Sequence, residues 1–430
     1  MTPEVRDRID QIRQGIVPEG YKKTKSGILP ESWSVRTIAE CLERVEHPVE
    51  VQANEMYTQI GIRSHGKGLF YKEPVTGDSL GNKSVFWIEP DCFILNIVFA
   101  WEQAVGKTTQ AEAGMIGSHR FPMYRPINGS IDIDYLISYL LTKRGTDILE
   151  AASPGGAGRN RTLGQDRFMK SRIVLPPLDE QKKIAEILST QDKAIELQGR
   201  KIEELKRFKK GCLEKMFPKK GQKVPEKRFP GFTDDWEQRK LTEFVEFFSG
   251  LTYTPNDVQE NGTLVLRSSN VSNGEVVDAD NVYVNPQVVN SENVKVGDIV
   301  VVVRNGSRSL IGKHAQIKTF MPNTVIGAFM TGIRSECPKF TNALLNTSRF
   351  EEEIAMNMGA TINQITGYMF SKMEFKVPCL DEQKEIGEYF ENLDHLITLH
   401  QRKLDEMKKQ KKALMQLLLT GIVKTKGEVR

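Results

Sequence analysis

The sequence predicts an α+β protein made of two similar halves, each with a mixed α/β domain and a long helix. A block covering residues 175–210 recurs at residues 377–412, at a constant offset of 202 without a gap. Each block continues in a seven-residue pattern without proline, which is typical of a coiled-coil helix. The 430 residues exceed one core of about 100–200 residues. We therefore expect two pseudo-symmetric mixed α/β domains separated by two long antiparallel coiled-coil helices.

The long helices are the best-defined elements of this prediction. The first should span Leu178 to Phe217, about 60 Å at 1.5 Å per residue. Asp179 and Asp381 are expected as N-caps or first-turn acids, and the basic runs near the helix ends suit the macrodipole. The predicted coiled-coil core comprises Ile184, Leu188, Ile195, Gln198, Ile202 and Leu205 in the first copy, and Ile386, Phe390, Leu393, Ile397, His400 and Leu404 in the second.

Two helices related by a twofold axis run antiparallel, and pairs of positions whose numbers sum to 602 match every core layer of the two copies. In this register Gln198 faces Leu404 and His400 faces Ile202. We interpret the two polar positions as a device that fixes the register, rather than as ligands. Positions 200–228 carry 12 Lys or Arg against 4 Asp or Glu. This charge is interpreted as a solvated face, with protein or nucleic-acid contact as the alternative.

The sequence divides into five parts. Residues 1–20 are an N-terminal helical segment, 21–175 and 221–377 are the α/β domains, 176–220 hold the central helix, and 378–430 hold the C-terminal helix and a basic tail. Within the domains, β-branched and aromatic runs bounded by Gly, Asn and Asp predict strands. The expected strands cover 93–100, 261–267 and 296–304, and the expected helices cover 131–150 and 340–358.

Loops of both domains place Arg, Lys, Ser and Asn next to glycine. Arg can donate a fork of hydrogen bonds to guanine, Asn can pair with adenine, and Ser or Lys can bind phosphate. Ordinary solvated loops are the alternative interpretation. The predicted DNA-contacting residues are Arg63, Ser64, Lys67, Arg159, Asn160 and Arg161 in the first domain, and Arg267, Ser268, Asn270, Arg304, Asn305 and Arg308 in the second.

No catalytic motif is found in the sequence. HExxH, G-x-S-x-G and EF-hand patterns are missing, and Gly106-Lys107-Thr108 is not a P-loop because Trp101 stands where the first glycine is required. The five cysteines lack CxxC spacing and the six histidines are isolated, so no metal site is predicted. The sequence also has no long apolar run, and the cytosol is the expected compartment. A recognition and scaffolding protein is therefore favoured.

A known family shares this organisation. Trp33 to Glu40 and Trp236 to Glu243 both read W-x-x-x-x-[IL]-x-E, and Leu175 to Leu188 and Val377 to Phe390 are the repeated helix starts. Over nearly its whole length the chain resembles the specificity (S) subunit of type I restriction-modification systems. Two departures are Cys379, which replaces the second proline of the repeat, and FTDDW in place of LPESW before the second tryptophan.

The resemblance implies two target recognition domains, each reading one half of a split site in double-stranded DNA, with the helices as a spacer. It implies two methyltransferase (M) subunits and restriction (R) subunits as partners, and no membrane. S-adenosylmethionine, ATP and Mg²⁺ are then expected on the partners and no cofactor on this non-catalytic chain. Two alternatives are a coiled-coil adaptor whose domains bind proteins and, less favoured, a chain that is itself a nuclease or methyltransferase.

Overall fold

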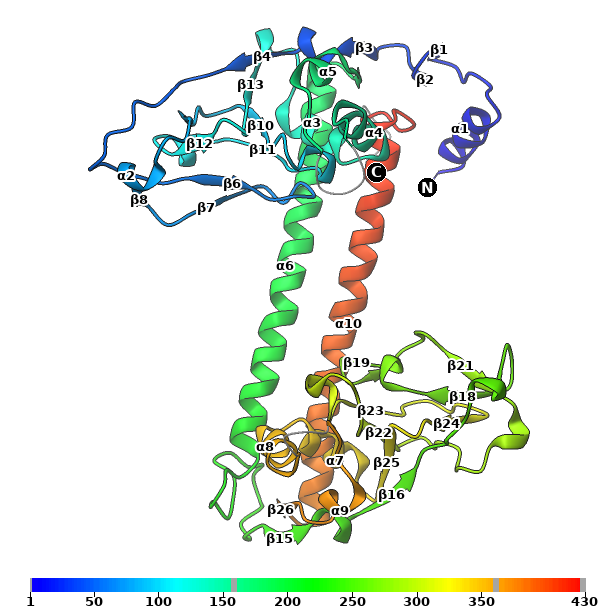
Figure 1. Ribbon diagram of the computed structural model, residues 1–430. Helices are drawn as coiled ribbons and strands as arrows, with labels where there is room; N and C mark the ends of the chain where they lie inside the picture. The colour runs from blue at the N-terminus through cyan, green and yellow to red at the C-terminus, as the bar shows by residue number, and fades with distance from the viewer. Residues whose placement is uncertain (1, 156–160, 359–362, 426–430) are drawn as a thin grey trace. The chain divides into compact units, whose positions relative to one another are not determined.

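The structure, a computed structural model, describes residues 2–155, 161–358 and 363–425. The chain forms two compact units. Unit 1 comprises Met1–Leu197 and Leu404–Arg430, and unit 2 comprises Gln198–Lys403. Both divisions fall inside a long helix, so each unit contains one α/β domain and one stretch of each long helix (Figure 1). We refer to the α/β parts as domain 1 (residues 21–175) and domain 2 (residues 221–377).

The two predicted long helices are confirmed. Helix α6 spans Leu178–Met216 and helix α10 spans Leu380–Leu419, 39 and 40 residues. The repeated glutamine near each start fixes the entry of the chain, because Gln181 Nε2 donates to Pro176 O and Gln383 Nε2 donates to Pro378 O, both at 2.9 Å. Asp179 and Asp381 lie in the first turn, where a negative charge suits the helix dipole.

Within each unit the two helix stretches run antiparallel, as predicted. In unit 1 Lys411 Nζ lies 2.5 Å from Asp192 Oδ1, and in unit 2 Lys209 Nζ lies 2.6 Å from Asp394 Oδ1. Both partners of the second pair are offset by 202 positions from those of the first, so the same ion pair occurs in each unit. The duplicated sequence therefore produces a duplicated helix contact.

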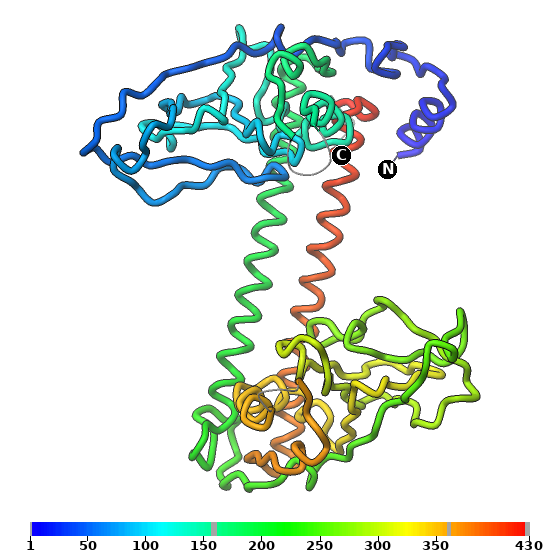
Figure 2. Tube along the Cα trace, in the orientation of Figure 1, coloured from blue at the N-terminus to red at the C-terminus, as the bar shows by residue number. Residues whose placement is uncertain are grey.

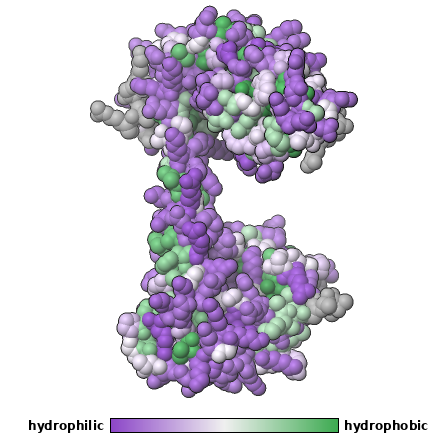
Figure 3. All heavy atoms as spheres, turned by 90° about the vertical axis from the view of Figure 1, so that its left-hand side faces the viewer, coloured by the Kyte–Doolittle hydropathy of each residue, from purple (hydrophilic) through white to green (hydrophobic). Residues whose placement is uncertain are grey.

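The predicted helix core is closed at its ends and half-open in its centre. Ile184, Leu188, Ile202, Leu205, Ile386, Phe390 and Leu404 are buried, whereas Ile195, Gln198, Leu393, Ile397 and His400 are half-buried. Ile184 and Leu188 belong to the core of unit 1, and Ile386 and Phe390 belong to the core of unit 2, whereas two helices alone leave the flanks of their seam open to solvent. A few large apolar side chains remain exposed on α6, whose surface is otherwise largely hydrophilic (Figure 3).

The two polar core positions bind each other. Gln198 was predicted to face Leu404, and His400 to face Ile202, and these layers stay a prediction. The Gln198 side chain reaches His400, with its Nε2 at 2.9 Å from both the ring Nδ1 and the backbone O. The glutamine side chain is long enough to cross one core layer, which lets the two polar groups satisfy each other. These residues occupy equivalent positions in the two copies of the repeat.

Both domains are built on the same four-stranded antiparallel sheet. Domain 1 has the order β11-β10-β13-β4, and domain 2 has β16-β25-β22-β23, which is the same path read from the opposite edge. In each sheet the strand that comes second in the chain, β10 in domain 1 and β22 in domain 2, is the most apolar. Strand β22 (Ile299–Val302) is buried throughout. The sheet strands are β4 (Leu42–Val45), β10 (Phe93–Leu95), β11 (Val105–Lys107), β13 (Met123–Pro126), β16 (Val245–Ser249), β22 (Ile299–Val302), β23 (His314–Gln316) and β25 (Met330–Ser335).

Short strand pairs complete each domain, and domain 2 also has a second four-stranded sheet in the order β17 (Val258–Gln259), β21 (Val282–Val284), β18 (Thr263–Leu266) and β24 (Thr324–Ile326), in which β18 and β24 run parallel. One pair joins the start of the domain to the strand before the long helix, β3 with β14 in domain 1 and β15 with β26 in domain 2. The other strands are β1 (Tyr21–Thr24), β2 (Gly27–Pro30), β3 (Ser34–Thr37), β5 (Met56–Tyr57), β6 (Ile60–Ile62), β7 (Leu69–Tyr71), β8 (Val75–Thr76), β9 (Val85–Trp87), β12 (Ile116–Ser118) and β14 (Arg172–Leu175) in unit 1, and β15 (Glu237–Lys240), β17 (Val258–Gln259), β18 (Thr263–Leu266), β19 (Val271–Ser272), β20 (Glu275–Val276), β21 (Val282–Val284), β24 (Thr324–Ile326) and β26 (Glu374–Val377) in unit 2.

Each single helix predicted within a domain is a pair of helices. Thr142 and Thr347 interrupt the helices because their hydroxyls accept from Gly145 N (3.2 Å) and Phe350 N (3.3 Å) and so cap a new one. A side chain at position 145 would lie 2.2 Å from Leu140 Cα, so glycine permits the close turn. The domain helices are α2 (Gly77–Leu80), α3 (Ile133–Leu140), α4 (Lys143–Ala152), α5 (Gln165–Lys170), α7 (Pro338–Leu345), α8 (Ser348–Asn357) and α9 (Gly367–Phe370).

The two repeated motifs bind each other in both units. Trp33 Nε1 donates to Glu180 Oε2 in unit 1, and Trp236 Nε1 donates to Glu382 Oε2 in unit 2, each at 3.1 Å. Both indoles are buried, so the carboxylate at the start of the long helix satisfies an otherwise unpaired donor. In unit 2, Arg228 also donates to both oxygens of Glu382, and this hydrogen bond raises the pKa of the guanidinium.

The two ends of the chain pack together in unit 1. The predicted N-terminal helix is α1 (Pro3–Arg13), and Arg8 Nη1 donates to Ile422 O at 2.8 Å. Tyr21 Oη donates to Gly421 O at 2.8 Å. In Figure 2 the blue N-terminal part and the red C-terminal part of the trace both lie in this unit. Of the helices in the described residues, none is long and apolar enough to cross a membrane.

Candidate nucleic-acid interface

Three segments converge at the same place in each domain, and they carry most of the predicted DNA-contacting residues. The strand-end segments (63–67 and 267–270) follow β6 and β18. The sheet loops (96–104 and 303–313) connect β10 to β11 and β22 to β23. The pre-helix segments (161–164 and 363–366) precede α5 and α9.

In domain 1 hydrogen bonds tie the three segments together. Ser64 Oγ donates to Glu102 Oε2 at 2.9 Å, which joins the strand-end segment to the sheet loop. Leu163 N donates to Ile97 O at 2.8 Å, which joins the pre-helix segment to the same loop. The sequence-predicted residues Arg63, Ser64, Lys67 and Arg161 therefore lie on one connected surface.

Domain 2 repeats this arrangement with different side chains. Asn305 Nδ2 donates to Ser268 Oγ at 3.1 Å, and Ile365 N donates to Val303 O at 2.8 Å. The latter bond is the counterpart of the Leu163 bond, because positions 163 and 365 differ by 202. Asn363 Nδ2 adds a bond to Gly306 O at 3.0 Å. The common framework thus presents a different set of side chains in each domain.

Aromatic rings position three of the predicted arginines. The guanidinium carbon lies 5.1 Å from the Phe70 ring centre for Arg63, 5.5 Å from Trp101 for Arg161, and 5.1 Å from Phe329 for Arg304. Such contacts are worth about 0.5–1 kcal/mol at exposed sites, and they orient the guanidinium. Arg63 Nη1 also donates to Leu69 O at 2.6 Å. Sequence reasoning missed these rings. An aromatic residue near an arginine in the sequence could have indicated such a contact. Phe329 is distant from Arg304 in the sequence, so this pair could not be predicted.

The remaining predicted residues of domain 2 differ in accessibility. Arg308 is exposed, as is Lys67 of domain 1. Arg267 is one-third exposed, and its Nη2 lies 2.6 Å from Asp280 Oδ2. It therefore reaches the surface already paired with a carboxylate.

The prediction that Asn270 contacts DNA is corrected. The residue is fully buried, and its Nδ2 donates to Ala279 O (2.7 Å) and Asn281 Oδ1 (2.8 Å). Its Oδ1 accepts from Arg267 N at 2.9 Å. The side chain is consumed in holding the strand-end segment against the loop that follows β20. Arg159 and Asn160 of domain 1 lie outside the described residues.

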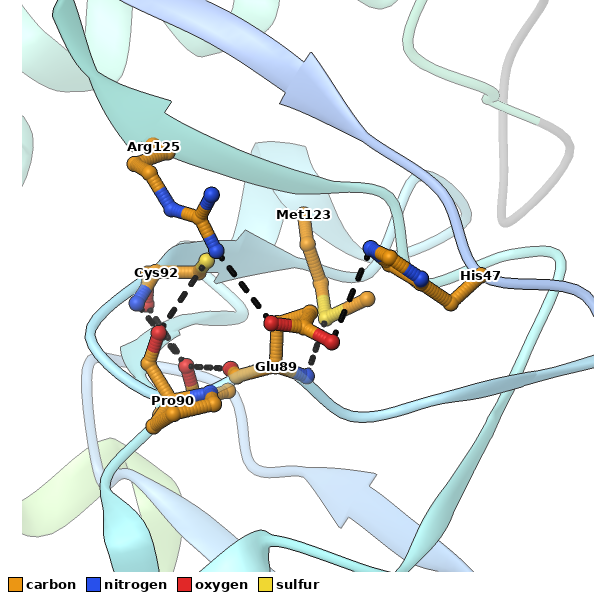
Figure 4. A network of polar contacts seen from close by, with 7 residues as sticks. His47, Glu89, Pro90, Cys92, Met123 and Arg125 are labelled. Carbon is orange, nitrogen blue, oxygen red and sulfur yellow. Dashed lines mark hydrogen bonds and ion pairs between the residues drawn. The ribbon is translucent and has the colours of Figure 1, made fainter.

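A further polar network lies at another edge of domain 1, where sequence analysis treated His47 as isolated (Figure 4). His47 Nε2 and Arg125 Nη2 point at opposite oxygens of Glu89, at 3.6 Å and 3.2 Å. Glu89 N also donates to the sulfur of Met123. These contacts join strand β13 to the β9–β10 connection, and a structural role accounts for them. The described residues contain no group of three or more His, Cys, Asp or Glu placed to hold a metal ion.

Comparisons with known proteins agree with this architecture. The family model for the type I restriction modification DNA specificity domain matches residues 85–207 and 233–409. The type I restriction enzyme MjaVIII specificity subunit of Methanocaldococcus jannaschii is 26% identical, with 97% of this chain and 99% of that protein aligned. The StySPI specificity subunit of Salmonella potsdam is 26% identical over 44% of this chain and 43% of its own length.

Solved structures share the fold at low sequence identity. A chain from a study of complex assembly and conformational transition in the type I R-M system has a TM-score of 0.58 at 16% identity, covering 92% of this chain and 99% of its own. The type I S subunit from M. genitalium has a TM-score of 0.55 at 14% identity, covering 90% and 96%. The family model matches residues 85–175 of domain 1, residues 233–377 of domain 2 and both helix starts. This chain therefore belongs to the family of type I restriction-modification DNA specificity subunits.

Proposed function

We propose that domain 1 and domain 2 each read one half of a bipartite DNA target through the strand-end, sheet-loop and pre-helix segments defined above. The observation that carries this proposal is the convergence of these segments in both domains, with exposed arginines resting on aromatic rings. Arg is suited to guanine O6 and N7 in the major groove. The different side chains on a shared framework account for two different half-sites.

The long helices serve in this proposal as spacer and docking surface for two M subunits. The duplicated ion pairs favour two identical partners, because each unit offers a similar helix pair. Leu197 and Phe208, exposed by 63% and 54%, supply apolar area on α6. S-adenosylmethionine, ATP and Mg²⁺ would be bound by M and R subunits, and this chain would contribute recognition alone.

Salt-dependent binding tests the DNA-binding part. The chain assembled with its M subunit should lose DNA affinity linearly in the logarithm of salt concentration, with a slope set by the number of phosphates contacted. The isolated chain should bind much more weakly, because an assembled complex contacts more backbone. An affinity that salt leaves unchanged would favour a protein adaptor instead. Equal affinity with and without the M subunit would contradict the expected weak binding of the isolated chain.

A further inference from the structure

A pocket of about 660 Å³ opens beside the strand-end segment of domain 2. Its size falls in the range of about 300–1,000 Å³ that is usual for small-molecule sites. Tyr253, Val282 and Met330 contribute to an apolar wall, and Phe329, 56% exposed, lies at its edge. The polar wall consists of Arg267, Ser268, Ser269 and Asp280. The candidate interface residues Arg267 and Ser268 thus line both the pocket and the surface proposed to face DNA.

The polar wall has unused hydrogen-bonding capacity. Asp280 is 74% exposed on its side chain, and its carboxylate has about four acceptor positions, of which Arg267 Nη2 uses one. Arg267 Nε is buried and has no hydrogen-bond partner among the described residues. A buried donor without a partner is unfavourable. The pair therefore offers both a carboxylate acceptor and guanidinium donors beside a flat apolar surface.

We propose that this pocket binds a guanine base. Guanine has two adjacent donors, N1–H and the N2 amino group, which match the two oxygens of a carboxylate, and an acceptor, O6, which matches a guanidinium. Adenine and cytosine have only an amino group for the carboxylate, and thymine has a single N–H. The apolar wall suits the faces of the ring, as in other proteins that read an unstacked base by its Watson–Crick edge.

Two sources can supply the base, an unstacked guanine of the DNA target or a free guanine nucleotide. The first source rests on the proposed function, and the second does not.

Asp280 adopts a left-handed backbone conformation (φ +50°), which holds its carboxylate beside Arg267 at the cost of some strain.

The first arm of the test measures binding of GMP, AMP, CMP and TMP to the full chain by calorimetry and saturation-transfer NMR. GMP should bind at least about ten-fold more tightly than the other three. Asp280→Asn should abolish this preference, since an amide presents a donor to N1–H. Ala328→Trp, at an exposed lining position, should block the pocket. Phe329→Ala should weaken GMP binding, whereas Phe320→Ala, at a 78%-exposed position that does not line the pocket, should not.

The second arm uses the chain assembled with its M subunit on its methylation target. Each guanine of one half-site is replaced by inosine, which lacks the N2 amino group, or by 7-deazaguanine, which lacks the major-groove acceptor N7. A base read in the pocket is sensitive to inosine at one position and insensitive to 7-deazaguanine there; major-groove reading gives the reverse. GMP binding without an inosine effect identifies the free nucleotide as the ligand.

Equal binding of the four nucleotides, or GMP binding that survives both Asp280→Asn and Ala328→Trp, would overturn the guanine site. So would the absence of GMP binding together with no inosine-sensitive position. In these cases DNA binding by the assembled complex would be unchanged, and the proposed function would stand. Thermal unfolding of each variant shows whether a loss of binding reflects a loss of folding.

Discussion

The arginines of the candidate interface differ in how they are held. The Arg304 guanidinium lies over the Phe329 ring and has no hydrogen-bond partner among the residues that the structure describes, whereas Arg267 donates to the Asp280 side chain and backbone. A guanidinium that is held in place while its N–H donors stay available is suited to reading a base edge. At the residue scale we therefore expect Arg304 to discriminate bases, and Arg267 to act with Asp280.

Arg304→Lys tests this difference because it keeps the charge and removes the planar fork. We expect it to reduce discrimination at one position of one half-site by about 1–3 kcal/mol, and to leave the salt slope nearly unchanged. Binding of the assembled complex to single-base variants of the target measures both. Lys372→Ala, an exposed cation elsewhere in domain 2, is the control. A uniform loss over all sequences would identify Arg304 as a phosphate contact.

Glu382→Gln should destabilise unit 2 more than Glu180→Gln destabilises unit 1. The Glu382 side chain is 1% exposed and bonds to both Arg228 and Trp236, so its loss of charge leaves a largely buried guanidinium uncompensated. Breaking a buried ion pair costs about 3–5 kcal/mol. The Glu180 carboxylate accepts a hydrogen bond from Trp33 Nε1 and a longer one, at 3.5 Å, from Thr425 N. Hydrogen exchange resolved by unit measures both effects, and equal losses would contradict this ranking.

Site residues were predictable from the sequence only in part. Arg63, Arg161 and Arg304 were predicted because Arg near glycine in a loop is visible locally, and their contact with DNA stays a prediction. Their aromatic partners were missed because folding, and not sequence proximity, brings them together. Asn270 shows the reverse error, since its amide has the chemistry to read adenine but is spent on backbone groups of its own domain.

At the element scale, strand β23 contains a buried histidine, and we expect this residue to make unit 2 sensitive to acid. His314 Nδ1 lies 2.9 Å from Gly312 O and accordingly carries the proton, so Nε2 accepts from Asn346 Nδ2 at 3.1 Å. Burial lowers the pKa of this imidazole below its usual 6.5, and the nearby Lys209 lowers it further, against opposing effects of the Gly312 carbonyl and Asp394.

Below about pH 6.5 the unfolded chain binds a proton that the folded unit does not. The free energy of unfolding therefore decreases as the pH is lowered. The decline is at most about 1.4 kcal/mol per pH unit, and it ends below the folded pKa. His314→Asn should lower stability at neutral pH and flatten this dependence, whereas His395→Gln, at an exposed position, should not. Denaturant titrations between about pH 7.5 and 5 measure the slope. An unchanged slope in His314→Asn would refute the assignment.

Elements were predictable to the extent that their signal is local and long. The helices α6 and α10 follow from a sustained seven-residue pattern, and the ends of α6 were placed to within a residue. The helix pairs α3–α4 and α7–α8 were each predicted as one helix, because a threonine cap in mid-pattern is also compatible with a continuous helix. The predicted strands were correct in place but too long, since turns after Leu95 and Val302 end them early.

At the scale of the whole molecule, unit 1 is completed by the C-terminal residues. Truncation after Leu419 removes the carbonyls that accept from Arg8 and Tyr21, together with the buried Val423. We expect this truncation to lower the stability of unit 1 by a few kcal/mol and to leave unit 2 unchanged, because one buried aliphatic side chain is worth about 1.5–3 kcal/mol. Amide hydrogen exchange distinguishes the units. Equal deprotection of both would show that they unfold as one.

The duplicated sequence, the duplicated sheet and the duplicated contacts between Trp and Glu all support two independent readers. Their separate hydrophobic cores, one in each unit, allow a substitution in one domain to leave the other unaffected. This independence is the central claim of the account, and a DNA target with two separable halves is its consequence.

Mapping of methylated adenines in cells that carry this chain with its M and R partners tests the claim most directly. The measurement compares the natural chain with Arg161→Ala in domain 1 and Arg304→Ala in domain 2. We predict a bipartite motif with an unread spacer, in which each substitution relaxes a different half and leaves the other half and the spacer unchanged. A continuous motif, or one substitution that relaxes both halves equally, would contradict the account.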